Sequence, residues 1–377
     1  MNKTIKYTAV VIVLFLMSMF LCGAAMPQEY YNDLEAIGAD ELETELSDET
    51  RGLMKRIGID RIDAESVISL SPADFFSLAL ELAKDAVRGP LKTFVAVMGI
   101  AVMCSLLSAM KETVGGKSLD SVFNIVCVAA ISSTVIYPVM NCIEKTSAAI
   151  KDFSAFMLSF VPVLSSVMAV SGTPLAATGY QTLVFSAAQL VSQVSSETLV
   201  PLLGIYMALC LVGGVSQIDV YAIAEAVKTA VNWALGLSMT LFVGLLSVQS
   251  LVASTADELT LKTAKFLIGN FVPVVGGALS DAFATAQGCL GLVKAAVGAY
   301  GIAAAAMTFL PVLFSAVAWR AVVGASSAVC AMLGIKRVSK VLSSAGTVLG
   351  ILISITMCFA LLMIITTSIM LKVGGGM

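Results

Sequence analysis

Long apolar runs alternate with short charged segments along the chain from residue 90 onward. The runs predict helices near residues 93–110, 121–140, 153–171, 180–195, 198–216, 230–252, 264–280, 284–304, 306–330 and 345–371. A helix that crosses a bilayer needs about 20 mostly apolar residues, and most of the runs supply them. The runs at 180–195 and 284–304 carry polar residues such as Gln189 and Lys294, so not every run needs to span. The pattern predicts an all-α, polytopic transmembrane helical bundle.

The composition supports a membrane protein and argues against an enzyme. Of the 377 residues, 58% are hydrophobic and 12% are charged, whereas soluble domains have about 25% charged residues. The absence of histidine excludes histidine-based triads, metal sites and proton relays. The eight cysteines form no CxxC pair and mostly lie in apolar runs, which favours buried thiols over a metal site. The sequence therefore predicts no catalytic, cofactor-binding or metal-binding residues, and the net charge of −3 gives no reason to expect a nucleic-acid partner.

Residues 1–25 resemble a secretory signal peptide. Lys3 and Lys6 form a basic start, an apolar run follows, and Gly23 to Ala25 supply small residues for cleavage after Ala25. An uncleaved anchor is the alternative. If the signal is cleaved, residues 26–89, with 15 acidic and 6 basic residues, are expected to lie outside the cytoplasm.

The end of this acidic segment predicts an amphipathic helix. Ser71 is a suitable N-cap and Pro72 suits the first helical position. Phe76 and Leu80 recur on one face, and Gly89-Pro90 is expected to break the helix before the first span. Such a helix could lie on the membrane surface, dock onto a partner, or pack on its own membrane domain.

Two parts of the membrane region resemble each other. Phe160–Val163 matches Phe271–Val274, and Thr198–Leu203 matches Thr308–Leu313, with offsets of about 110 residues. The matches predict a tandem repeat, with residues 90–152 as a first transmembrane hairpin, 153–262 as repeat A and 263–377 as repeat B.

Prolines within the matching segments indicate broken helices. A proline removes one backbone hydrogen bond, and in lipid the freed carbonyl needs a partner within the protein or in a wet cavity. Broken helices at matching positions of two repeats can mark a substrate path; a packing kink is the alternative. The predicted path or helix-break residues are Pro162, Pro201, Asn270, Pro273, Gly276, Gly277, Asp281 and Pro311.

Charged residues within the apolar runs bear on topology. Lys294 and Arg320 are predicted intramembrane charges, which are costly in lipid. Arg320 could instead mark an interface where two shorter helices meet. With the start outside, the loops at 111–120 and 331–344 fall inside, and the inside loops carry a small excess of positive charge. The neighbouring acids Asp257 and Glu258 are interpreted as solvated charge in a loop.

The whole arrangement is similar to the stage III sporulation protein AE family. The resemblance rests on the signal-like start, the acidic external segment with its stretch Gly52–Ile59, the polytopic region and, most sharply, the segment Asn270–Asp281. It implies a mother-cell membrane facing the engulfed forespore, and a channel-like complex with an ATPase, ring-forming proteins and a forespore partner. The family has no established catalytic residues, so the resemblance supplies none.

Two functions follow from these features. The first is a non-enzymatic membrane component of a sporulation-specific trans-envelope channel or secretion complex that is required for forespore development. The second is an autonomous small-molecule permease whose two repeats alternate access to a central path. Membrane lipid is a partner in both, and self-association is left open by the sequence.

Overall fold

The computed structural model describes residues 42, 44–59, 72–114, 117–194, 197, 200–215, 221–271 and 276–372, and these form eight helices. The helices are α4 (Asp48–Arg56), α6 (Pro72–Val114), α7 (Lys117–Val170), α8 (Pro174–Gln193), α9 (Val200–Val215), α10 (Tyr221–Phe271), α11 (Gly276–Met332) and α12 (Lys336–Lys372). Five of them, α6, α7, α10, α11 and α12, are long and apolar enough to cross a membrane. The predicted all-α class is confirmed, whereas the signal peptide lies outside the described residues.

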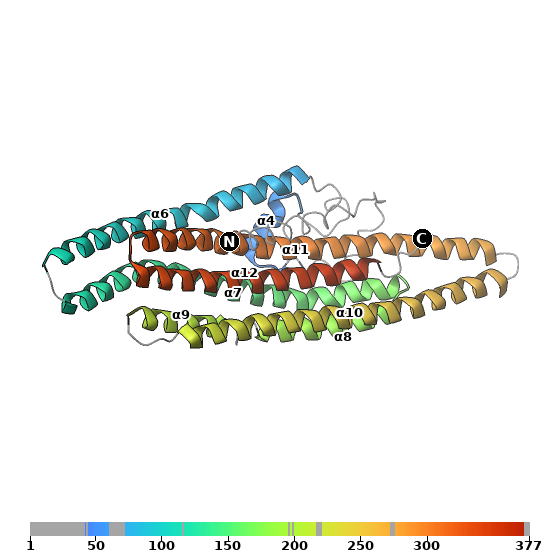
Figure 1. The fold of residues 1–377 in the computed structure, drawn as a ribbon. Helices are drawn as coiled ribbons and strands as arrows, with labels where there is room; N and C mark the ends of the chain where they lie inside the picture. The colour runs from blue at the N-terminus through green and yellow to red at the C-terminus, as the bar shows by residue number, and fades with distance from the viewer. Residues whose placement is uncertain are drawn as a thin grey trace.

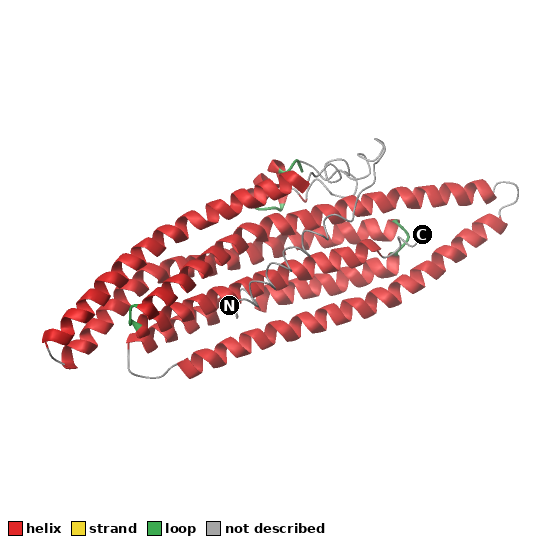
Figure 2. Ribbon diagram, turned by 45° about the horizontal axis from the view of Figure 1, so that its top comes forward, coloured by secondary structure: helices red, strands yellow, loops and turns green. Residues whose placement is uncertain are grey.

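The long helices form an elongated antiparallel bundle (Figures 1 and 2). Successive long helices run in opposite directions along one axis, and α8 and α9 together follow the course of a single long helix (Figure 1). At 1.5 Å per residue, the 57 residues of α11 reach about 85 Å. This helix is far longer than the roughly 30 Å hydrocarbon core of a bilayer.

Several predicted helix breaks are wrong, because the apolar runs join into longer helices. Pro90 lies inside α6, so the amphipathic helix continues directly into the first span. Arg320 lies inside α11, so two shorter helices do not meet there. The runs near 121–140 and 153–171 form one helix, α7. A proline costs a helix about 3 kcal/mol, and packing along a continuous bundle offsets that amount.

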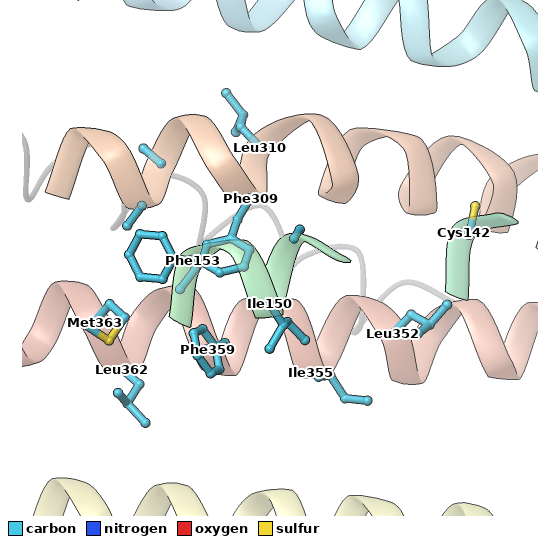
Figure 3. Packing of buried hydrophobic residues seen from close by; sticks show 14 of the residues in the cluster. Cys142, Ile150, Phe153, Phe309, Leu310, Leu352, Ile355, Phe359, Leu362 and Met363 are labelled. Atoms are coloured by element: carbon cyan, nitrogen blue, oxygen red, sulfur yellow. The ribbon is translucent and has the colours of Figure 1, made fainter. Parts of the chain in front are cut away.

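The centre of the bundle is built from α7, α11 and α12. In the most apolar stretch of each, more than half of the residues are buried, against 17% for α6 and 22% for α10. An aromatic cluster joins the three central helices (Figure 3). The ring of Phe309 lies 5.1 Å from that of Phe153 and 5.7 Å from that of Phe359. The flanking helices α6 and α10 therefore carry much of the exposed apolar surface.

The short helix α4 packs across the middle of this bundle. Its Leu53 and Met54 are buried, and the hydroxyls of Thr50 and Thr308 are 3.2 Å apart. Arg56 forms an ion pair with Glu81 of α6. The start of α6 buries Phe75 and Leu78 against the bundle, whereas Phe76 and Leu80 of the predicted apolar face are exposed. What that face contacts therefore stays a prediction.

Candidate functional site

A buried carboxylate holds the junction of α7, α8, α10 and α11. Asp257 of α10 is 2% exposed, and its two oxygens accept hydrogen bonds from the backbone N–H groups of Leu175 and Ala176, at 3.1 and 2.9 Å. These amides belong to the first turn of α8, whose N–H groups have no partner within the helix. The carboxylate of one helix therefore caps another and is stabilised by its positive end.

A buried lysine shares this junction. Lys294 of α11 is 4% exposed, and its charge is attracted by that of Asp257. A buried charge is tolerated where an opposite charge and hydrogen bonds replace water. Asp257 links α10 to the start of α8, and its charge attracts Lys294 of α11. We call these two residues the Asp257–Lys294 pair.

The turn between α7 and α8 is fixed against the same helices. Ser171 donates a hydrogen bond to the carbonyl of Leu290 on α11, at 3.2 Å. Gly172 has φ +91°, and a Cβ there would lie 2.6 Å from the side chain of Gln287 and 2.8 Å from that of Leu261. Glycine is required at this position both for the backbone conformation and for the close approach of the neighbouring helices.

A second polar feature is a cavity of about 170 Å³ beneath α4. Three exposed charged residues line it, Glu49 from α4 and Lys145 and Asp152 from α7. Thr308 and Pro311 of α11 form its far wall. Of the predicted path residues, Pro311 is thus placed beside a polar cavity that draws on three helices.

The other predicted prolines have different surroundings. Pro162 lies inside the continuous helix α7, where its carbonyl accepts hydrogen bonds from the hydroxyls of Ser165 and Ser166. Pro201 is the second residue of α9, a position where a missing N–H costs little. Pro273 lies outside the described residues. Of the two matching pairs, only Pro201 and Pro311 both lie in the described residues, and their settings differ, since Pro311 lies inside α11. The tandem repeat stays a prediction.

The remaining predicted residues gather near the link between α10 and α11. Asn270 lies in the last turn of α10, Gly276 and Gly277 begin α11, and Asp281 follows one turn later. Their role in a path also stays a prediction, because the side chains of Asn270 and Asp281 lie outside the described part of the structure.

Arg320, the second predicted intramembrane charge, is half-buried against α12. Its guanidinium group lies where a Cβ on Gly350 would stand. The absence of a side chain on Gly350 therefore makes room for the arginine head group.

Sequence reasoning missed Asp257. The interpretation of this residue as solvated loop charge is wrong, because it lies within α10 and is buried. Its neighbour Glu258 is exposed and pairs with Lys262 at 2.5 Å, as a solvated charge would. A signal was present in the sequence, since Asp257 follows a long uncharged stretch, but only the fold shows that α8 begins beside it.

Comparison with known proteins decides the family. A sequence model of the family described as stage III sporulation protein AE matches residues 62–374. The chain belongs to the stage III sporulation protein AE family. The matched range runs from the segment before α6 to the end of α12, so it covers the bundle and the Asp257–Lys294 pair, whereas α4, which forms one side of the cavity, precedes it.

One curated member of the stage III sporulation protein AE family allows a direct comparison. Stage III sporulation protein AE of Bacillus subtilis (strain 168) is 27% identical over 210 residues, which are 54% of this chain and 51% of that protein. The alignment thus spans about half the length of this relative. No solved structure matches the chain. Membership gives the chain a role in sporulation, and its long apolar helices make it a multi-pass membrane protein.

Proposed function

We propose that this protein is a non-enzymatic membrane component of a trans-envelope channel or secretion complex that links mother cell and forespore. The family match over residues 62–374 carries the proposal. The protein lies in the mother-cell membrane around the forespore, with its N-terminal segment outside the cytoplasm. Its partners are other stage III sporulation proteins, including an ATPase and ring-forming proteins.

The fold supports a role based on binding and support. The aromatic cluster packs α7, α11 and α12 together, and Asp257 links α10 to the start of α8. The charged surface around α4 offers polar contacts that lipid cannot use, as expected for a subunit that contacts other proteins or water.

Affinity purification from sporulating cells tests this proposal. A tagged chain that restores sporulation to a deletion strain should co-purify an ATPase and ring-forming membrane proteins, while an untagged strain serves as the control. The purification should be done under cross-linking conditions that capture a known membrane complex. If the functional tagged chain is then recovered without any other sporulation protein, the proposal is contradicted.

An autonomous permease is the second candidate, favoured by the polar cavity beside Pro311. A permease should move its solute when the purified chain alone is placed in vesicles. A complex subunit should be inactive until its partners are present. Transport by the chain alone would therefore replace the first proposal with the second.

The prolines test whether either function uses the predicted path. We expect Pro162→Ala and Pro273→Ala each to lower sporulation several-fold while protein level and membrane insertion stay normal, because a continuous helix is easily formed in lipid. The double variant should do little more harm than the worse single one, since both would affect one path. Normal sporulation in a stably inserted double variant would leave these prolines as packing features.

A further inference from the structure

The outer face of α10 is suited to lipid. Between residues 229 and 256 of this helix seven large apolar side chains are exposed, namely Trp233, Leu237, Leu241, Leu245, Val248, Leu251 and Val252. Residues 229–256 contain no charged side chain. At 1.5 Å per residue this stretch is about 42 Å long, enough to cross the roughly 30 Å core of a bilayer.

Contacts between helices show what lies at the same height on the rest of the bundle. Gln249 of α10 packs on Gly179 of α8, and the next residue of α8, Tyr180, lies beside Thr367 of α12. Gln249 and Thr367 are therefore level with each other. Because α10 and α12 run in the same direction (Figure 1), the levels can be followed along both helices.

Leu241 lies eight residues before Gln249 on α10, and Phe359 lies eight residues before Thr367 on α12, so these two are also level. The ring of Phe359 lies 6.3 Å from that of Phe153 on α7. The middle of the apolar face of α10 is therefore level with the part of α7 around residue 153.

At that height α7 presents charge to the surroundings. Glu144, Lys145, Lys151 and Asp152 are all exposed. The neighbouring helices add further exposed charges, including the ion pairs Arg56–Glu81 and Arg88–Asp85. The polar cavity beneath α4 opens on the same side. Lipid hydrocarbon cannot cover such a surface without a large free-energy cost.

We propose that the bundle faces lipid along α10, and that at the same depth the side formed by α4 and residues 144–152 of α7 faces water. The water-facing side forms part of the wall of an aqueous passage, with the cavity beside Pro311 as a recess in it. This inference deepens the proposed role in a channel or secretion complex by naming the surface that meets hydrated cargo.

Cysteine labelling in permeabilised sporulating cells tests the proposal on a matched pair. In a cysteine-free background, Ala148→Cys lies on the charged side, where Ala148 is exposed and lines the cavity, and Leu241→Cys lies on the outer face of α10. A charged, water-soluble maleimide should label the first at least tenfold faster, and both should react fully after denaturation. Equal rates, or protection of the cysteine at position 148, would overturn the proposal.

Fluorescence gives a second measurement that keeps the native cysteines. The chain has two tryptophans, and Trp233 on α10 is 70% exposed. In a Trp319→Phe variant in bilayers, brominated lipid should quench Trp233 strongly. In Trp233→Phe/Trp319→Phe, a tryptophan introduced by Ala148→Trp should be quenched by aqueous acrylamide and little by brominated lipid. Equal quenching of both positions by brominated lipid would overturn the proposal.

These measurements are independent of the complex itself. The expected labelling together with a purification that recovers no partner would contradict the complex and leave the water-facing side standing. If the complex is recovered but both positions contact lipid, the complex stands and the water-facing side is contradicted.

Discussion

Two turns of the bundle share one backbone pattern but differ in their surroundings. In the α7–α8 turn, the N–H of Thr173 bonds to the carbonyl of Met168, and Gly172 bonds to Ala169. The α11–α12 turn around Gly334 repeats this pattern, with hydrogen bonds of the same two spacings. Both are Schellman motifs, in which a glycine with positive φ ends the helix.

The neighbours of the two turns are different. A Cβ on Gly172 would meet Gln287 and Leu261, whereas nothing lies within 4 Å of a Cβ on Gly334. The first turn also adjoins the Asp257–Lys294 pair, while the second receives a hydrogen bond of 3.4 Å from Ser105 to the carbonyl of Leu333. Local sequence thus specifies the turn, and tertiary contacts determine how firmly it is held.

Of the changes near the two turns, removing the carboxylate of Asp257 should lower the stability of the protein most. Asp257→Ala removes a negative charge that attracts the buried Lys294 and leaves the first turn of α8 without its cap. Loss of a helix cap costs about 0.5–2 kcal/mol, and loss of the attraction between Asp257 and Lys294 adds to that amount. We expect a marked fall in the thermal unfolding midpoint of the purified protein in detergent, and faster proteolysis between α7 and α8.

A double variant separates the pair from general damage. Asp257→Asn keeps a hydrogen-bond acceptor but removes the charge, and Lys294→Met removes the other charge. Because replacing both charges of a buried pair is often close to neutral, the double variant should be more stable than either single variant. A double variant as unstable as the sum of the two would mean that the charges do not interact.

The two glycines provide the next test. Both Gly172→Ala and Gly334→Ala place a side chain at positive φ, which costs about 1–2 kcal/mol. Gly172→Ala should destabilise the protein more, because only its new methyl group also meets neighbouring side chains. Unfolding midpoints measured side by side would show the difference. Equal midpoints would mean that the contacts around Gly172 yield without cost.

Much of the fold follows from the sequence, because burial and lipid both select long apolar runs. The positions of α8 and α9 agree with the predicted runs near 180–195 and 198–216 within a few residues, apart from the later start predicted for α8. The joining of runs into α6, α7 and α11 could not be predicted. Charged or proline-containing junctions such as Gly89-Pro90 favour a break locally, and only packing against the rest of the bundle keeps them helical.

The candidate site was less accessible to sequence reasoning. Lys294 stood out because a lysine in an apolar run is costly. Its partner Asp257 lies 37 residues earlier on a different helix, beside an exposed acid, Glu258. No periodicity within one helix relates Asp257 to the start of α8, so the pair and its capping role emerge only from the fold.

A substitution of Arg320 is expected to have the smallest effect on stability, and it can be compared directly with a substitution of Lys294. Arg320 and Lys294 lie on the same helix, 26 residues or about 39 Å apart. Lys294 is buried beside an acid, whereas Arg320 is half-buried and its head group lies over Gly350. A methionine fills similar space there without a charge, so we expect Arg320→Met to change stability by no more than about 0.5 kcal/mol, as for substitutions away from buried networks.

Lys294→Met is the matched variant, since it makes the same chemical change on the same helix. We expect it to lower the unfolding midpoint clearly, because Asp257 then remains buried with its backbone hydrogen bonds but without a cation. Gly350→Ala should also have little effect, because the atoms it meets belong to the flexible end of the Arg320 side chain. If Arg320→Met destabilised the protein as much as Lys294→Met, the arginine would hold a buried interaction of equal strength, and the contrast between the two parts of α11 would fail.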